Sequence, residues 1–180
     1  MDDGGTGSQC PEAAPRERDR RDGFTLIELM VIVSIIAILF GIAIPAFLSS
    51  RRRAQDIASR SNLRNALSSA QTIFSGNEAY LATAPMITSL GTEAPGLTFQ
   101  DDATPSTAPA QLSVATSSTA GGSLDTIILA SRSGSGTCWY YRHVASSGLP
   151  SSGTFYATTA TGTDCEASNA PAAPAVWSAL

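Results

Sequence analysis

One apolar segment near the N-terminus constrains this chain more than any other feature. Residues 29–48 carry no charge and consist almost wholly of Leu, Ile, Val, Ala, Phe and Met. About 20 apolar residues in a helix span the hydrocarbon core of a bilayer, so length and composition predict a transmembrane helix. Glu28 departs from a simple anchor, because an ionisable group within membrane depth is costly unless it is paired. We therefore expect Glu28 to need a partner.

Composition narrows the classes of protein open to the rest of the chain. The 180 residues leave room for one modest domain besides the helix. The net charge of -4 and the isoelectric point near 4.8 give no basic footprint for a nucleic acid. Three cysteines leave one odd thiol if a disulfide bond forms.

The segment before the helix is polar and basic at its end. Residues 1–22 contain Gly and Pro and have nothing that could bury a core, so we expect disorder. A secretory signal is cleaved after its apolar region, whereas this charged segment adjoins the helix directly. Cys10 is not a lipoprotein site, because no apolar region precedes it. A plain alternative is a solvated cytoplasmic tail ahead of a signal anchor. Its arginines are Arg16, Arg18, Arg20 and Arg21.

After the apolar segment the pattern becomes amphipathic. Apolar residues at three- and four-residue steps form one stripe, with polar residues between them. Gly76-Asn77 is a stop signal, so we predict one helix from Phe24 to Ser75. Its first half is apolar all round, and its second half needs a partner on one side. The stripe consists of Ala54, Ile57, Ala58, Leu63, Ala66, Leu67, Ala70, Ile73 and Phe74.

Two features of this helix leave alternatives open. Pro45 removes a backbone hydrogen bond and, with Gly41 nearby, favours a kink, but membrane helices also tolerate proline. Arg51, Arg52 and Arg53 mark the membrane exit. They can bind lipid headgroups or neighbouring subunits, although a solvated collar is favoured.

The remainder of the chain has the pattern of a small sheet. Residues 77–96 predict an irregular connection with one helical turn. Short strands follow, bounded by Gly, Ser and Pro, and their close spacing favours antiparallel pairing, with a hairpin across Arg132–Gly136. Three to five strands would cover the stripe from Ala54 to Phe74, giving an α+β fold. The predicted strands are Leu97–Gln100, Gln111–Thr116, Thr126–Ser131, Thr137–Val144 and Thr154–Thr158.

The junction before the apolar segment carries a specific motif. Residues Arg20–Leu29 read RRDGFTLIEL, which closely resembles the prepilin processing motif of type IV pilins and pseudopilins. The match covers the basic leader end, Gly23, Phe24 and Glu28 in register, and it extends to Pro45. The resemblance is sharp over about residues 20–75 and loose beyond them.

The resemblance implies that a prepilin peptidase cuts between Gly23 and Phe24 and methylates the new amine of Phe24. Glycine suits such a cut, because it has no side chain to clash in a protease cleft. Cutting there keeps the helix on the mature protein and places a positive amine at its start. Glu28, which the helix dipole also favours, can then pair with its own N-terminus or with that of a neighbour and set the register of a filament.

The resemblance also divides the chain. It implies that residues 1–23 are a leader that is removed. Residues 24–76 are the long helix, of which 24–48 lie in the membrane or the filament core and 49–76 are amphipathic. Residues 77–180 are an extracellular β-rich head. Outside the cytoplasm we expect Cys138 and Cys165 to form a disulfide bond, as in the C-terminal loop of many pilins. Cys10 leaves with the leader.

The head lacks an obvious catalytic or metal-binding constellation. His143 is the single histidine, and a surface or pocket-lining role is favoured over a catalytic one. The acid pairs Asp101-Asp102 and Asp164/Glu166 favour solvated loops over a calcium site. The aromatic run from Trp139 to Tyr141 favours core packing over an adhesive face. We expect no enzyme activity, no cofactor and no metal.

The sequence therefore predicts a pilin-like prepilin that polymerises into an extracellular filament. Its partners would be other copies of itself, the prepilin peptidase and methyltransferase, the inner-membrane assembly machinery and the membrane. Before assembly it would cross the inner membrane once, with the leader in the cytoplasm. The alternatives are a pseudopilin of a type II secretion or DNA-uptake system and, less favoured, a membrane-anchored enzyme or binding protein.

Overall fold

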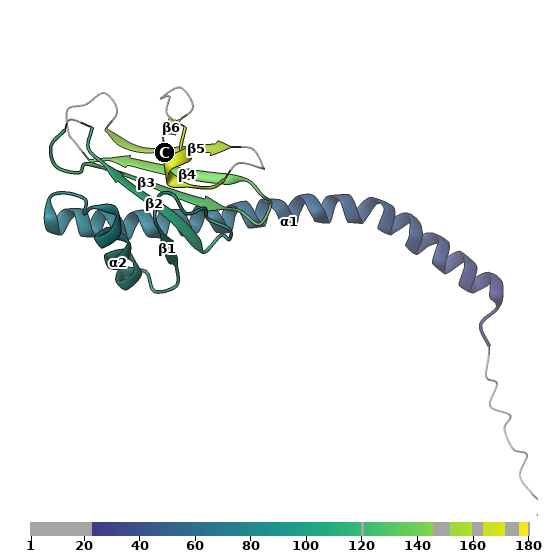
Figure 1. Ribbon diagram of the computed structural model, residues 1–180. Helices are drawn as coiled ribbons and strands as arrows, with labels where there is room; N and C mark the ends of the chain where they lie inside the picture. Colours follow the sequence, from purple (N-terminus) through teal and green to yellow (C-terminus); the bar gives the residue numbers. More distant parts are fainter. Residues whose placement is uncertain (1–22, 120, 146–151, 160–163, 172–176, 180) are drawn as a thin grey trace, which may run out of the picture. The chain divides into compact units, whose positions relative to one another are not determined.

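The computed structural model describes residues 23–119, 121–145, 152–159, 164–171 and 177–179 (Figure 1). The chain divides into two units, with the boundary between Ala43 and Ile44. The helices are α1 (Leu26–Asn77), α2 (Thr83–Glu93) and the 3-10 helix η1 (Ala167–Asn169), and the strands are β1 (Thr98–Gln100), β2 (Gln111–Ser117), β3 (Thr126–Arg132), β4 (Cys138–Val144), β5 (Gly153–Thr159) and β6 (Ser178–Ala179). The predicted α+β class is confirmed.

The long helix α1 forms as predicted, but its ends lie two residues further along the chain. At the C-terminal end, the side chain of Asn77 donates to the carbonyl of Ile73 at 2.9 Å. This bond occupies a carbonyl that the last turn leaves without a backbone donor. The residue that leaves the helix is Glu78, with a φ of 55°, rather than Gly76. The Gly76-Asn77 signal therefore predicted the region of the helix end correctly, but the helix continues through both residues to Asn77.

The strands pair in the order β1-β2-β3-β4-β5-β6. The predicted hairpin is confirmed, with Arg132 opposite Cys138 at its closed end. All pairs are antiparallel except β1 and β2, whose parallel pairing corrects the expectation. A parallel partner needs a connection that returns along the strand, and residues 101–110 are long enough for this because β1 has only three residues. The sixth strand, β6, has two residues and no strand pattern of its own.

Helix α2 contradicts the expected irregular connection in residues 77–96. It has 11 residues, and the proline and glycine that suggested breaks are placed harmlessly. Pro85 lies in the first turn, where its missing N–H is not needed, and Gly91 lies near the C-terminal end. Met86 and Leu90, one turn apart, are both completely buried. Their burial stabilises a helix that local propensity does not favour.

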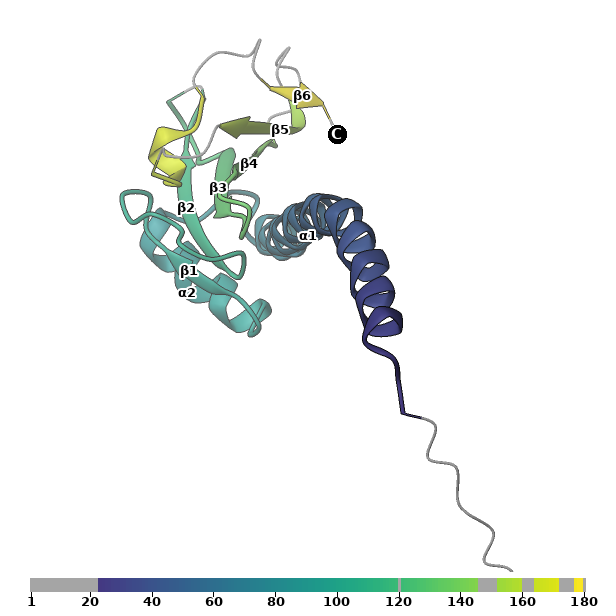
Figure 2. The same ribbon diagram turned by 90° about the vertical axis from the view of Figure 1, so that its right-hand side faces the viewer.

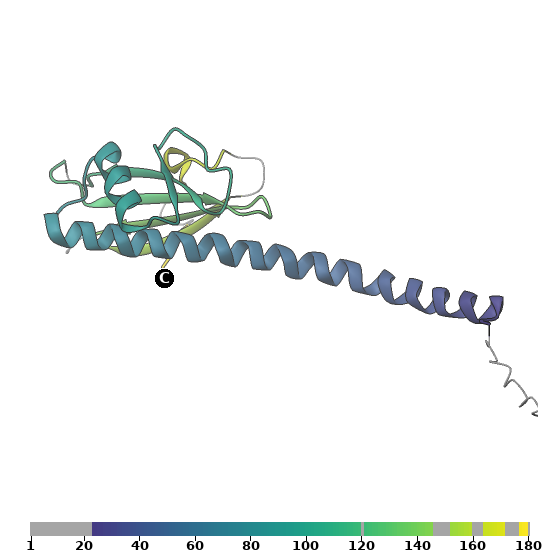
Figure 3. The ribbon, with the colours of Figure 1, turned by 90° about the horizontal axis from the view of Figure 1, so that it is seen from below.

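One face of the sheet packs against the second half of α1 and against α2. In Figure 3 this half of α1 runs along the sheet. The buried core on this face consists of Leu63, Ala66, Leu67, Ala70, Ile73, Tyr80, Met86, Leu90, Leu112, Val114, Ile127, Leu129 and Tyr141. The stripe predicted to begin at Ala54 is corrected at its start, because Ala54, Ile57 and Ala58 are exposed and the first buried residue is Ser59.

Before Ser59, α1 lies against the β3–β4 turn rather than against the strands. Ser135 Oγ in this turn donates to Asp56 Oδ1 at 2.6 Å. At Gly134 a Cβ would stand 2.9 Å from Cδ of Gln55. A glycine therefore lets the turn approach the helix closely.

The opposite face of the sheet packs against the C-terminal segment. Figure 2 shows η1 and α1 on opposite sides of the sheet. The core on this side consists of Ala130, Cys138, Tyr140, Ala157, Cys165, Ala167 and Trp177. The expected disulfide bond joins Cys138 to Cys165 across 27 residues, a separation that stabilises the fold by roughly 3–4 kcal/mol in the chain-entropy model. Tyr140 and Tyr141 are both fully buried, on opposite faces of the sheet. The prediction that these aromatic residues pack in the core is therefore confirmed for both.

We predict that Leu63→Ala lowers the free energy of unfolding by about 2–5 kcal/mol, because it leaves a cavity between α1 and the sheet. Leu63 is completely buried, whereas Ile57 on the same helix is 63% exposed. Ile57→Ala is therefore the matched control and should change the free energy by less than about 0.5 kcal/mol. Chemical denaturation in detergent, followed by tryptophan fluorescence, measures both. Equal effects of the two substitutions would contradict this packing.

Candidate processing and assembly site

The predicted processing junction, just before α1, is open. Gly23 and Phe24 precede α1, and the side chain of Phe24 is 74% exposed. Apart from its chain neighbours, no described residue has an atom within 4 Å of the position that a Cβ on Gly23 would take. The described fold therefore has room for a larger side chain at position 23. A steric requirement for glycine there would come from a protein that binds this junction.

Thr25 caps the start of α1, a role that our reading of the sequence missed. Its Oγ1 accepts a hydrogen bond from the backbone N–H of Glu28 at 3.3 Å. Its carbonyl accepts one from the N–H of Leu29, also at 3.3 Å. Threonine followed three residues later by glutamate is the spacing of a capping box, so this signal was available in the sequence. The cap fixes the helix start two residues after the predicted cut.

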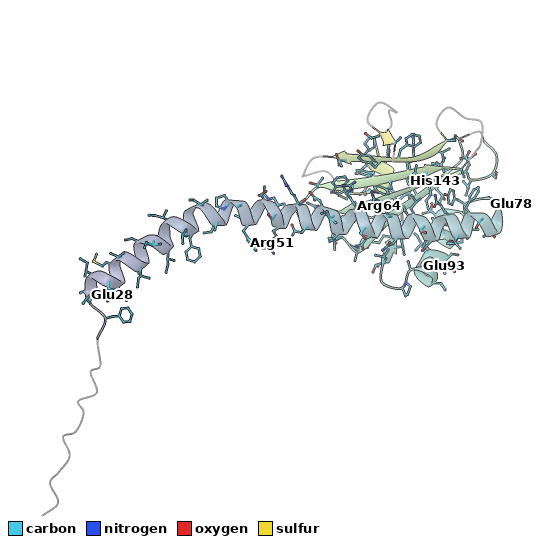
Figure 4. The ribbon with its side chains drawn as sticks, turned by 180° about the vertical axis from the view of Figure 1, so that it is seen from behind. Glu28, Arg51, Arg64, Glu78, Glu93 and His143 are labelled. Carbon is cyan, nitrogen blue, oxygen red and sulfur yellow. A yellow bond between two sulfur atoms is a disulfide. The ribbon has the colours of Figure 1, made fainter. Side chains whose placement is uncertain are left out.

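Glu28 lies in the first turn of α1 and is exposed. Figure 4 labels it at the beginning of the helix. Its carboxylate has no hydrogen bond or ion pair with any described residue. The positive end of the helix dipole favours a carboxylate in this turn. The position suits pairing with a cation near the start of a helix, and the described part of the chain supplies none.

The apolar segment has no protein cover within the chain. Every large apolar side chain from Leu26 to Leu48 is between 43% and 78% exposed. The helix is long and apolar enough to cross a membrane by length and composition. Pro45 lies within α1 without interrupting it; the kink at Pro45 and Gly41 stays a prediction. So large an apolar surface requires lipid or other protein around it.

The arginine cluster after this segment is exposed and unpaired. Arg51, Arg52 and Arg53 make no ion pair with any described residue. Their positions agree with the predicted exit collar. Cys10 and the leader arginines, including Arg20 and Arg21, lie outside the described residues.

His143 packs inside the head. Its Nδ1 lies 2.6 Å from the hydroxyl of Tyr80, and the two rings meet edge to face with centroids 6.1 Å apart. Burial lowers the pKa of His143 and raises that of Tyr80. A neutral imidazole whose Nδ1 accepts a hydrogen bond from the Tyr80 hydroxyl fits both shifts. This pair joins β4 to the segment after α1, and no described carboxylate or nucleophile bonds to it.

The acids of the two predicted pairs are exposed or half-buried. Asp101, Asp102 and Asp164 are exposed. Glu166 is half-buried, and its Oε2 accepts hydrogen bonds from Ser168 and Asn169. Among the described residues, no group of three or more His, Cys, Asp or Glu side chains is arranged to hold a metal ion.

Comparison with known proteins finds a family match near the N-terminus. The family model for the prokaryotic N-terminal methylation motif matches residues 18–44. The type IV major pilin protein PilA of Myxococcus xanthus is 40% identical over 65 residues, which cover 36% of this chain and 30% of that protein. The type IV wide pilus major component of Thermus thermophilus is 38% identical over 69 residues, covering 38% of this chain and 53% of that protein.

A third relative, the prepilin peptidase-dependent protein D of Escherichia coli, is 58% identical over 36 residues, covering 20% of this chain and 25% of that protein. Each match thus covers less than two thirds of the relative's own length. No solved structure matches the chain. The predicted resemblance to type IV prepilins is confirmed over the region that contains the motif.

We predict that acid destabilises the head through His143. Because burial lowers its pKa below the ordinary 6.5, the unfolded chain takes up the proton first as the pH falls. Stability contributed by the neutral imidazole is therefore present above about pH 6.5 and is lost as the pH falls below it. His143→Gln keeps a hydrogen-bonding group without titrating, so it should flatten this part of the curve. Identical pH profiles of unfolding for the two proteins would contradict the prediction.

Proposed function

We propose that this chain is a prepilin whose mature form is a structural subunit of a type IV pilus-like filament. One observation carries the proposal: the methylation motif at residues 18–44 falls in register on an exposed apolar helix with an unpartnered acid in its first turn. A plain membrane anchor explains the apolar surface but gives no reason for Glu28. A filament of copies explains both.

The proposed pathway begins in the inner membrane, with the leader in the cytoplasm and the head outside. A prepilin peptidase cuts between Gly23 and Phe24, and the new amine is methylated. The open junction supports this step, because Gly23 and Phe24 lie outside α1 and nothing crowds Gly23. Residues 24–48 cross the membrane until the assembly machinery extracts the subunit into the filament.

Within the filament, Glu28 pairs with the Phe24 amine of a neighbouring copy. A carboxylate and an ammonium attract strongly where apolar side chains exclude water. The surrounding surface from Leu26 to Leu48 provides that exclusion once copies pack together. An unpaired carboxylate there is costly, so the pair favours one register of neighbouring helices over others. This role is structural and needs no enzyme activity.

The direct test is electron microscopy of filaments sheared from cells, with mass spectrometry of their main protein. We expect an N-methylated peptide beginning at Phe24 as its dominant N-terminus. Gly23→Asp should abolish that peptide and leave the uncut chain in the membrane. Filaments in which this chain is a trace component would favour the pseudopilin alternative. A Gly23→Asp variant that matures to the Phe24 N-terminus would contradict the processing step.

We predict that Glu28→Ala leaves processing and membrane insertion intact but reduces filaments at least about tenfold, the effect of losing roughly 1.4 kcal/mol in an equilibrium. Glu28→Asp keeps the charge on a shorter side chain and should retain part of the yield. Filament yield is measured beside the Phe24 N-terminal peptide, which separates assembly from cleavage. Wild-type numbers of filaments from the alanine variant would count against the pairing.

A further inference from the structure

Exposed arginines and exposed acids gather on different parts of the unit that begins at Ile44. Arginines gather on α1, at Arg51, Arg52, Arg53, Arg60 and Arg64, whereas the exposed acids, Glu78, Glu93, Asp101, Asp102 and Asp164, follow α1 in the chain. One acid, Asp56, lies on α1 among the arginines, where it is half-buried and accepts a hydrogen bond from Ser135. None of these arginines has an ion pair with a described residue. The chain thus presents two charged surfaces of opposite sign and does not join them to each other.

The positive surface includes a groove on α1. It is lined by Ile57, Arg60, Ser61, Arg64 and Asn65, and we call it the α1 groove. Ile57 is 63% exposed within it. The guanidinium of Arg60 is held 5.0 Å from the ring centre of Trp139, and its Nε is shielded from solvent without a hydrogen-bond partner among the described residues. Arg64 is exposed on the same groove (Figure 4).

These properties favour a carboxylate-bearing protein as the occupant of the groove. Guanidinium groups bind carboxylates through paired N–H donors. The exposed Ile57, which lines the same groove as Arg60 and Arg64, offers apolar contact to the same partner. Lipid headgroups fit less well. Arg64 follows the end of the apolar segment at Leu48 by roughly 24 Å of helix at 1.5 Å per residue, whereas the headgroup layer is roughly 5–8 Å deep on each side.

The negative surface is held in place by a buried serine. We call Asp101, Asp102 and Glu166 the acidic patch. The Oγ of Ser113 donates to the carbonyl of Asp101 at 2.8 Å and accepts from the N–H of Ala167 at 2.9 Å. These bonds hold the loop after β1 beside the segment that contains Glu166. Ser113 is completely buried.

A further backbone bond joins the same two segments, from the N–H of Ser168 to the carbonyl of Asp102 at 3.1 Å. The backbone of the acidic patch is therefore fixed before any partner arrives. Like charges at fixed spacing repel one another, and a complementary positive surface relieves that repulsion.

We propose that the α1 groove of one copy of this chain binds the acidic patch of another copy. The two surfaces differ, so the contact is head-to-tail and propagates into an open assembly rather than closing as a two-fold dimer. The inference rests on the proposed filament and adds to it a second, polar contact in the part of the chain beyond the membrane segment. It selects which neighbour each head meets.

Charge reversal tests the contact. Arg64→Glu and Asp102→Arg should each lower filament yield by about tenfold, because each brings like charges together. The double variant restores the attraction and should recover yield to within about twofold of the wild type. Glu78→Arg, an exposed acid outside the patch, is the matched control and should assemble normally. Single variants that assemble as the wild type does, or a double variant no better than either, would overturn the proposal.

Cross-linking gives an independent readout of the same contact. Arg64→Cys combined with Asp102→Cys should form disulfide-linked ladders in sheared filaments, because the proposed contact brings the two new cysteines of neighbouring copies together. Cys138 and Cys165 do not interfere, since they already bond to each other. Arg64→Cys with Glu78→Cys is the control and should form none. Filaments without ladders would overturn this contact alone, whereas absence of filaments from the wild type would overturn the proposed function. Loss of membrane association in Arg64→Glu with unchanged filaments would assign the groove to lipid headgroups and also overturn the proposal.

Discussion

The packing of α1 against the sheet is the interaction on which the head depends. Leu63 and Leu67 fill the space between helix and sheet, while Ala66 and Ala70, one turn apart, let the strands come close. Helix α2 adds Met86 and Leu90 to the same core. Because this face has no core without the second half of α1, the head cannot be separated from the helix that also carries the apolar segment.

The second layer of the head depends on the C-terminal segment. Its disulfide bond to β4 and its contacts through Ala167 and Trp177 cover the side chains that point away from α1. The guanidinium of Arg142 lies 5.4 Å from the ring centre of Phe155 and 5.0 Å from that of Trp177, which joins three separate segments. The same segment reaches Ser113 and so fixes the acidic patch. Core packing and surface charge are therefore set by the same contacts.

Much of the fold could be predicted because its signals are local. Runs rich in Val, Ile, Thr or aromatic residues, bounded by Gly, Ser or Pro, indicated β2 to β5, and the helical period indicated α1. Helix α2 was missed because Pro85 and Gly91 suggest breaks, and only the burial of Met86 against a distant sheet outweighs them. The parallel pairing of β1 and the strand β6 also depend on contacts far apart in sequence. At the candidate site, the motif indicated Gly23 and Glu28, but the partner proposed for Glu28 lies on another chain and leaves no signal in a single sequence.

The proposed filament subunit must prefer its own copies to lipid, although its apolar segment suits both. Lipid tails are as apolar as leucine, so burial of residues 26–48 gives little net drive between helices within a membrane. Polar groups make the difference, because lipid tails offer them no partner. Glu28 lies at one end of the apolar segment and Arg64 well beyond the other. Pairs at both places would favour the assembled state and fix the register of the apolar surface between them.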